Sequence, residues 1–262
     1  MKNILLLGAT GSIGDSVLSV IEQNQQSLNL YAITLDSNTS KAKDISESFT
    51  PEYIHINNEK TFNKIKEDNE INSKVLNGSS DLSALINDDN VDIIVSAITG
   101  FAGLEATAIA SKTGKTILLA NKESIVAAGE LILLSAESSG TTIIPIDSEH
   151  NAIFQCLAGE KNTDDVSKII ITASGGPFLN KSLSSLKGVT KEQALKHPNW
   201  SMGSKISIDS ATLVNKCLEL IEAKYLFGLD EQFFELVIHP QSIVHSIVSY
   251  RDGSSICQMS NP

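Results

Sequence analysis

Two carboxylates, a hydroxyl and an imidazole directly follow an apolar run in the middle of the chain. The run covers residues 143–146, and the next residues are Asp147, Ser148, Glu149 and His150. Such a run is typical of a buried strand, and ligands of open α/β sheets bind beyond the carboxyl ends of strands. In an extended chain Asp147 and Glu149 would point the same way, and a hard cation such as Mg²⁺ or Mn²⁺ would offset their charges. The alternative is a helix N-terminus capped by Asp147 or Ser148.

Two further polar residues follow apolar runs. Lys122 comes after the run at residues 116–119, where its ammonium would hold an anionic oxygen; the alternative is a solvated lysine in the first turn of a helix. Ser174 opens a Ser-Gly-Gly turn after the run at residues 166–173. That turn offers a hydroxyl and backbone N–H groups to an oxyanion, and a plain turn is the alternative.

A loop and a helix add more candidates. The only tryptophan, Trp200, lies in a polar loop and favours a lid over a ligand; a tryptophan docked on its own domain is the alternative. A helix is predicted over residues 208–226, with Asn215 and Glu219 on one face and Lys216 beside them. An ordinary solvated face is the alternative there. The apolar face of this helix is predicted to hold Leu213, Cys217, Leu220, Ile221 and Tyr225.

The elements that must position these residues begin with a glycine turn. An apolar run at residues 4–7 leads into Gly8, Gly11 and Gly14, and a helical pattern follows. Strand, glycine turn and helix form the context of a dinucleotide fingerprint, because glycines let the backbone approach a pyrophosphate. Asp36 ends the next strand, at the position where such folds bind the adenosine ribose of the cofactor. A carboxylate there accepts from a 2′-OH and repels a 2′-phosphate, so the spacing leaves the choice of cofactor open.

Short apolar runs then alternate with helix-compatible stretches up to about residue 147, and this rhythm predicts a Rossmann-like, doubly wound parallel sheet. From residue 148 the rhythm changes to an α+β pattern, with runs at 234–238, 243–250 and 255–259 that suggest a mixed or antiparallel sheet with a hairpin. We therefore predict an α/β protein with two domains, residues 1–147 and residues 148–262.

Composition excludes several classes of function. The chain has 262 residues, a net charge of -11 and 41% hydrophobic residues, which suits a globular protein and argues against nucleic-acid or anionic-membrane partners. No apolar stretch approaches the roughly 20 residues that span a bilayer. Cys156, Cys217 and Cys257 lie far apart among apolar neighbours, so we expect buried thiols in a cytoplasmic protein.

Taken in order, the motifs resemble the 1-deoxy-D-xylulose 5-phosphate reductoisomerase family from end to end. The first motif is shared by many folds, whereas the others are specific in this order. The matching stretches are residues 8–14, 119–124, 147–154, 174–178, 197–203, 209–212 with Asn215 and Lys216, and 239–242.

The resemblance implies an enzyme of the methylerythritol phosphate route to isoprenoids. It would rearrange 1-deoxy-D-xylulose 5-phosphate and reduce the product with NADPH to 2-C-methyl-D-erythritol 4-phosphate, using Mg²⁺ or Mn²⁺, as a homodimer. By position, the metal ligands would be Asp147, Glu149 and Glu219. The catalytic residues would be Lys122 and the three metal ligands. The substrate residues would be Lys122, Ser148, Glu149, Ser174, His197, Ser210, Asn215, Lys216 and Glu219, with Trp200 in the flexible loop over the active site. The cofactor residues would be Thr10, Gly11, Ser12, Ile13, Asn38, Asn121, Glu123 and Gly203.

Two departures and three alternatives accompany this resemblance. Many family members carry a small or basic residue at Asp36 or Ser37, and they continue beyond residue 262 into a helical domain. We therefore weigh a truncated, inactive nucleotide-binding fragment as the alternative function. A short-chain dehydrogenase would need a Tyr-x-x-x-Lys pair, which none of the four tyrosines provides. A semialdehyde dehydrogenase would need an exposed nucleophilic cysteine.

Overall fold

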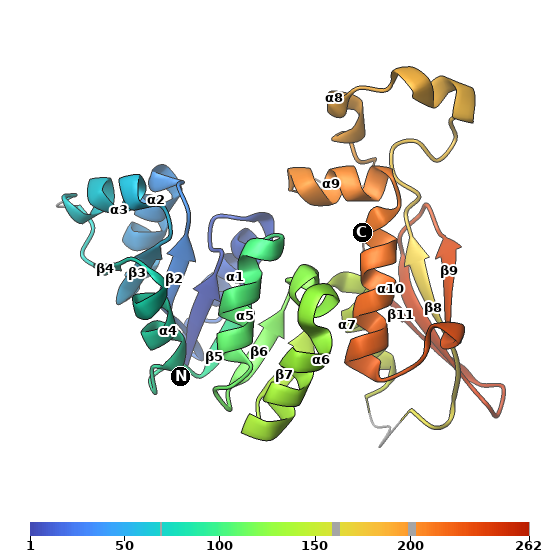
Figure 1. The fold of residues 1–262 in the computed structure, drawn as a ribbon, viewed down its shortest axis with the longest axis horizontal. Coiled ribbons are helices and arrows are strands. Elements are labelled where there is room, and N and C mark those ends of the chain that lie inside the picture. The colour runs from blue at the N-terminus through green and yellow to red at the C-terminus, as the bar shows by residue number, and fades with distance from the viewer. Residues whose placement is uncertain (69, 159–162, 199–202, 262) are drawn as a thin grey trace. The chain divides into compact units, whose positions relative to one another are not determined.

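The chain divides into two compact units, residues 1–144 and residues 145–262 (Figure 1). The computed structural model describes residues 1–68, 70–158, 163–198 and 203–261. The division that we predicted after Asp147 falls just inside the second unit, at the start of its first helix.

The first unit is built on a seven-stranded sheet in the order β4-β3-β2-β1-β5-β6-β7. The strands are β1 (Lys2–Leu7), β2 (Leu28–Leu35), β3 (Tyr53–Ile56), β4 (Lys74–Leu76), β5 (Ile93–Ser96), β6 (Thr116–Leu119) and β7 (Thr142–Pro145). The pairs from β4 through to β6 are all parallel. Because β5 lies beside β1 rather than β4, the strand order reverses between β1 and β5, which is where doubly wound sheets bind ligands. The predicted fold of this part is confirmed.

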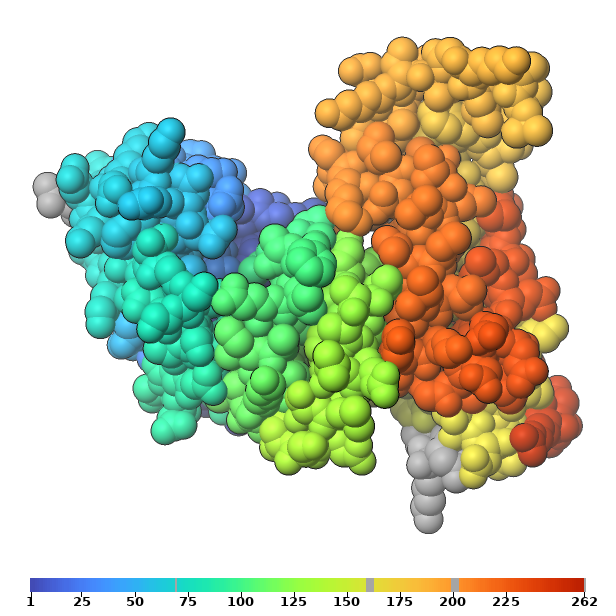
Figure 2. Space-filling model, viewed as in Figure 1, coloured from blue at the N-terminus to red at the C-terminus, as the bar shows by residue number. Residues whose placement is uncertain are grey.

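Six α-helices connect these strands. They are α1 (Ser12–Gln23), α2 (Thr39–Phe49), α3 (Glu59–Lys66), α4 (Ser79–Asn87), α5 (Leu104–Ala110) and α6 (Lys122–Ser139), with a 3-10 turn at Phe101–Gly103 before α5. Right-handed crossovers in the two directions from β1 place α1 to α3 on one face of the sheet and α4 to α6 on the other. Figure 2 shows α4, α5 and α6 together on one surface of this unit.

The turn after β1 is closed by tight packing of α1. A Cβ added at Gly14 would lie 2.3 Å from the carbonyl oxygen of Ala9, a separation that real structures do not allow. The N-cap of α1 is Gly11, which has no side chain to occupy the first N–H groups of the helix. Those N–H groups remain suited to an anion such as a pyrophosphate.

Replacing Gly14 with Ala is expected to lower the free energy of unfolding by about 1–3 kcal/mol, because α1 must move away from the turn. The same movement should weaken dinucleotide binding. Urea unfolding measures the first effect and fluorescence titration with NADPH the second. Gly11→Ala is the matched control for stability, since its nearest new contact is 3.6 Å away, at the Gly8 carbonyl oxygen. Equal losses of stability in both variants would contradict the packing argument.

The second unit is built on a four-stranded sheet in the order β11-β10-β8-β9. The strands are β8 (Val166–Ala173), β9 (Phe234–Ile238), β10 (Val244–Tyr250) and β11 (Ser255–Met259). β10 pairs antiparallel with β8 and β11, whereas β8 and β9 are parallel. The predicted hairpin is therefore confirmed as β10–β11 and the sheet is mixed. The parallel pair arises because residues 234–238 return to β8 after a long helical connection.

In the part of this unit that the structure describes, four α-helices accompany the sheet: α7 (Ser148–Cys156), α8 (Lys191–Ala194), α9 (Ser204–Ala211) and α10 (Val214–Phe227). Two 3-10 turns lie at Leu183–Gly188 and Glu231–Phe233. Ile153 of α7, Ile171 of β8, Ala223 of α10 and Val248 of β10 belong to one buried cluster, so α7, α10 and the sheet share a core. Among the described helices of the chain, none is long and apolar enough to cross a membrane.

The single helix predicted over residues 208–226 is two helices. The break lies at Thr212 and Leu213, and Leu213 has φ 62° and ψ 7°, a left-handed conformation that ends α9 and redirects the chain into α10. The predicted apolar face is also wrong. The buried residues of α10 are Lys216, Glu219, Glu222 and Ala223, while Leu213, Cys217, Ile221 and Tyr225 are exposed. The helix turns its charged residues inward, which periodicity of apolar residues could not predict.

Candidate active site

Three carboxylates of the second unit converge on one point. Asp147, Glu149 and Glu219 each offer one oxygen, and these oxygens lie within 4.8 Å of one another. Glu149 is 8% exposed and Glu219 only 1%, although the two residues are 70 positions apart in the sequence. Such closely grouped, buried anions are costly unless a cation compensates them, and oxygen donors of this type suit Mg²⁺ or Mn²⁺.

The local structure around Asp147 is a helix start, so the extended chain that we first considered there is wrong. Asp147 is the N-cap of α7, and Glu149 lies in its first turn. The Asp147 side chain makes no capping hydrogen bond; its Oδ1 lies 3.1 Å from Nδ1 of His150 instead. Both carboxylates therefore lie at the start of α7. The carboxylate pair and the helix N-terminus, which we weighed as alternatives, occur together in one structure.

Lys216 is buried between two of these carboxylates. Its Nζ donates to Glu149 Oε1 and, at 2.5 Å, to Glu219 Oε2. The remaining oxygens of both glutamates are also engaged: Ser148 Oγ donates to Glu149 Oε2 at 2.5 Å, and Asn215 Nδ2 donates to Glu219 Oε1. Although burial lowers the pKa of Lys216, the charges of Glu219 and Glu149 outweigh it and raise that pKa.

His150 is a second buried cation beneath the carboxylates. Its Nε2 lies 2.8 Å from the Glu219 carbonyl oxygen, and its Nδ1 lies 3.4 Å from Glu222 Oε2 as well as near Asp147. Burial alone lowers the pKa of His150, but the negative charges of Glu222 and Asp147 raise it to about 9. The cluster thus groups four carboxylates with two basic side chains, and the remaining excess of negative charge favours a divalent ion. The donor set and its charge both fit the implied metal.

A cavity of about 10 Å³, room for about one water molecule, lies beside Lys216. Its lining includes four residues that we predicted to bind substrate: Ser174, Ser210, Asn215 and Lys216. A fifth, His197, lies with its Nε2 2.9 Å from Ser174 Oγ, and burial lowers the pKa of His197. Gly176 permits this grouping, since a Cβ there would lie 2.8 Å from the Ser210 carbonyl oxygen. The predicted lid residue Trp200 lies outside the described residues.

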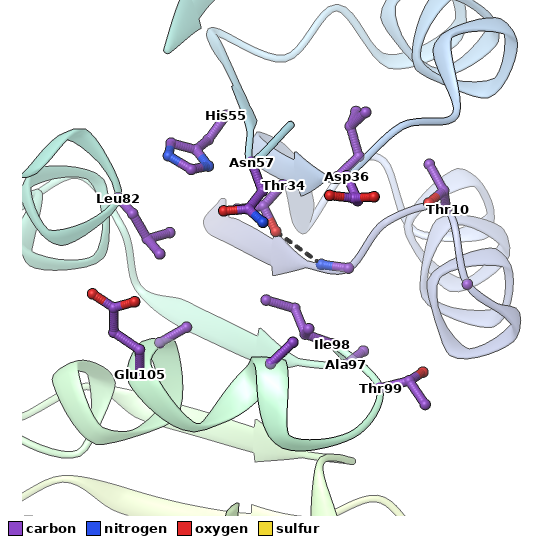
Figure 3. A pocket seen from close by; sticks show the side chains of 15 residues that line it. Thr10, Thr34, Asp36, His55, Asn57, Leu82, Ala97, Ile98, Thr99 and Glu105 are labelled. Carbon is purple, nitrogen blue, oxygen red and sulfur yellow. Dashed lines mark hydrogen bonds between the residues drawn. The ribbon is translucent and has the colours of Figure 1, made fainter. Parts of the chain in front are cut away.

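The first unit contains a cavity of about 360 Å³ at the carboxyl ends of β1, β2, β3 and β5 (Figure 3). Thr10 and Gly11, which we predicted to bind the cofactor, line it, and so does Asp36. Gly8 N donates to Thr34 Oγ1 at 3.0 Å and closes its floor. Thr99 lines the cavity too, in the turn after β5 that the sequence placed near the cofactor. The sequence reasoning missed further lining residues, which lie at the end of β3 or on helices: His55, Asn57, Leu82 and Glu105.

The other predicted cofactor residues occupy helix starts. Ser12 and Ile13 open α1, and Asn38 caps α2 by accepting from Lys41 N at 3.2 Å. Asn121 caps α6; its Nδ2 donates to the carbonyl oxygens of Ile98 and Gly100, at 2.6 and 2.9 Å, and to Glu123 Oε2 at 3.1 Å. Lys122 is buried as the first residue of α6. Gly203 is the N-cap of α9, in the second unit.

A doubly wound sheet with a glycine turn at its switch point, followed by a unit with a buried carboxylate triad, is typical of dehydrogenases that also use a metal ion. The family model described as 1-deoxy-D-xylulose 5-phosphate reductoisomerase matches residues 4–129, and the model of that enzyme's C-terminal domain matches residues 143–227. The chain belongs to the 1-deoxy-D-xylulose 5-phosphate reductoisomerase family.

Relatives and solved structures agree with this assignment. The chain is 49% identical to the reductoisomerase of Clostridium tetani and 46% identical to that of Shewanella frigidimarina, and it aligns over its whole length with 69% of each. A crystal structure of a DOX-P reductoisomerase in complex with NADPH, fosmidomycin and magnesium matches with a TM-score of 0.95 at 43% identity. The enzyme of Zymomonas mobilis in complex with NADPH matches with 0.90 at 44%. The chain is covered completely in both comparisons and spans 67% of each solved chain.

The structure corrects our expectation about the cysteines, and the family assignment now excludes the semialdehyde dehydrogenase in its place. We expected all three cysteines to be buried and used this against a semialdehyde dehydrogenase. Only Cys156 is buried, whereas Cys217 and Cys257 are exposed. Cys217 is exposed because it lies on the outer face of α10, opposite the charged residues that the helix buries.

Proposed function

We propose that this chain converts 1-deoxy-D-xylulose 5-phosphate to 2-C-methyl-D-erythritol 4-phosphate, with NADPH and a divalent ion, in the methylerythritol phosphate route to isoprenoids. The observation that carries the proposal is the convergence of Asp147, Glu149 and Glu219 beside a polar cavity. Membership of the family and the NADPH and magnesium complexes of its solved members support it.

The residues divide the work by their chemistry. Asp147, Glu149 and Glu219 would hold Mg²⁺ or Mn²⁺, which supplies Lewis-acid polarisation of substrate oxygens when bound. Ser174, Ser210, Asn215 and Lys216 would bind the phosphate, with His197 orienting Ser174. Ser148 and Lys122 would contact substrate oxygens nearer the reacting carbons. Binding energy from contacts with the remote phosphate would orient the substrate and thereby raise kcat.

The cavity of the first unit would bind the dinucleotide. Thr10, Gly11, Ser12 and Ile13 would meet the pyrophosphate at the start of α1. Asn38, Asn121, Glu123 and Gly203 would complete the cofactor site, and Trp200 would close over the substrate. We further propose a cytoplasmic homodimer. Three free cysteines favour a reducing compartment, and exposed apolar residues of the edge strand β9 offer a contact surface.

The decisive assay is NADPH oxidation with 1-deoxy-D-xylulose 5-phosphate, with Mn²⁺ or Mg²⁺ and again after chelation with EDTA. The full-length enzyme of Clostridium tetani serves as the positive control. Metal-dependent turnover with formation of the branched product supports the proposal. NADPH binding without metal-dependent product formation favours the alternative, a nucleotide-binding fragment without turnover.

Asp36 predicts a weakened preference for NADPH over NADH. Figure 3 shows its side chain at the cavity, close to Thr10. Lys41, whose ammonium donates to the Thr10 carbonyl oxygen at this turn, is already paired with Asp15 at 2.5 Å. A 2′-phosphate would therefore meet an uncompensated carboxylate. We expect Asp36→Asn to raise the ratio of kcat/KM for NADPH over NADH by roughly tenfold. Asp44→Asn, on an exposed position of α2, is the control. Strong NADPH selectivity in the unmodified chain would refute the prediction.

A further inference from the structure

Lys216 contacts two of the three carboxylates that would hold a divalent ion. Its ammonium contacts Glu149 Oε1 and Glu219 Oε2, and both residues belong to the triad whose oxygens lie within 4.8 Å of one another. An ammonium and a metal ion cannot share two carboxylate oxygens at these distances, because like charges so close repel strongly. Metal binding at the triad therefore requires Lys216 to leave.

The destination of the displaced lysine would be the neighbouring cavity, which must widen to hold an anion. Lys216 also lines the small cavity that contains Ser174, Ser210 and Asn215. The lysine stem has four flexible carbons, so its ammonium can swing about the helix without movement of the backbone. A buried ammonium without a counter-charge is costly, however, and the described lining of this cavity contains no carboxylate. The lysine would be stable there only with an anion.

We propose that Lys216 couples the metal ion to the substrate phosphate: it neutralises the triad when the metal is absent, and metal binding transfers its charge to the phosphate cavity. The inference rests on the proposed function, since it uses the same triad and cavity. It adds that the two ligands bind with positive cooperativity, because each removes the cost of moving Lys216 for the other. By linkage, each ligand must strengthen the other by the same factor.

Calorimetric titration of the whole chain with MgCl₂ and with inorganic phosphate tests the coupling. We expect the affinity for phosphate to rise roughly 5–20-fold at saturating Mg²⁺, and the affinity for Mg²⁺ to rise equally at saturating phosphate. Titrations in protein-free buffer correct for the magnesium phosphate complex. Phosphate and Mg²⁺ that bind the unmodified chain independently would overturn the inference without any variant.

Lys216→Met gives the second arm of the test. The variant has no ammonium to displace, so it should bind Mg²⁺ alone more tightly than the unmodified chain, bind phosphate more weakly and show no coupling. Lys216→Gln, which keeps a hydrogen-bonding side chain, should behave similarly, and thermal unfolding verifies the fold of both. Lys224→Met is the matched control, since Lys224 lies exposed on the same helix and pairs with Glu231. Weaker Mg²⁺ binding or intact coupling in the Lys216 variants would overturn the inference.

The two proposals fail differently. Metal-dependent turnover together with independent binding of Mg²⁺ and phosphate removes only the coupling by Lys216. Absence of both Mg²⁺ binding and turnover in the unmodified chain removes the proposed function and the inference with it.

Discussion

Glu149→Gln is expected to reduce turnover roughly thousandfold, equivalent to about 4 kcal/mol of lost transition-state stabilisation, while NADPH binding survives. The substitution keeps the shape of the side chain but removes one of the charges that would hold the metal. In the unmodified chain the ammonium of Lys216 contacts the Glu149 carboxylate, and the substitution places a neutral amide there instead. Asp147→Asn should act in the same way. The cofactor cavity belongs to the first unit, so its affinity should change little.

Steady-state NADPH oxidation measures the loss of turnover, and fluorescence titration measures the retained cofactor affinity. Glu235→Gln is the matched control, because Glu235 forms an exposed ion pair with Lys168 on the sheet of the same unit. If both triad variants keep near-normal rates, the carboxylates do not hold the catalytic metal.

His150→Leu is expected to lower the free energy of unfolding by about 3–5 kcal/mol, because it leaves the fully buried Glu222 without the cation beside it. The double variant His150→Leu with Glu222→Leu should recover part of this loss, since an apolar pair of similar volume replaces the ion pair. Urea unfolding of metal-free protein measures both. Lys168→Met, which breaks an exposed ion pair, should cost no more than about 1 kcal/mol. A His150→Leu variant as stable as this control would show that the buried pair contributes nothing.

The same pair predicts how stability depends on pH. His150 has a folded pKa of about 9, above its ordinary value of 6.5. A raised pKa means that the folded state holds the proton more tightly, so the contribution is complete below pH 6.5 and is lost as pH rises through about 9. Urea unfolding across this range should therefore show a loss in the unmodified chain that is absent in His150→Leu.

The parallel sheet could be predicted because its signals are local. The glycine turn after β1 and the alternation of apolar and polar runs depend on neighbours in sequence, whereas the strand order, with its reversal between β1 and β5, comes from the structure. The helix α10 could not be predicted in the same way. Its buried face carries Lys216, Glu219 and Glu222, which are stable there only because α7 brings opposite charges from about 70 positions away. The periodicity of apolar residues cannot reveal such ion pairs, so the face of α10 that we predicted to be buried is the exposed one.

The candidate site shows the same division. The motifs led to the three carboxylates, and the structure brings them together. The contact of Lys216 with Glu149 had no counterpart in the sequence, because it depends on how α10 packs against α7, whereas the contact with Glu219 lies within α10. His55 and Asn57 were missed for a related reason: a residue at the end of β3 reaches the cofactor cavity only once β3 is placed beside β2.

The left-handed backbone at Leu213 limits which amino acids can replace this residue during evolution. A leucine with φ 62° carries a torsional penalty that glycine or asparagine would largely escape, whereas a β-branched residue or proline could scarcely adopt the conformation. The direction of α10, and with it the aim of Asn215 and Lys216, is fixed by this one torsion. Neutral exchange at position 213 is thereby confined to a few amino acids, even though its side chain supplies no charge, proton or metal ligand.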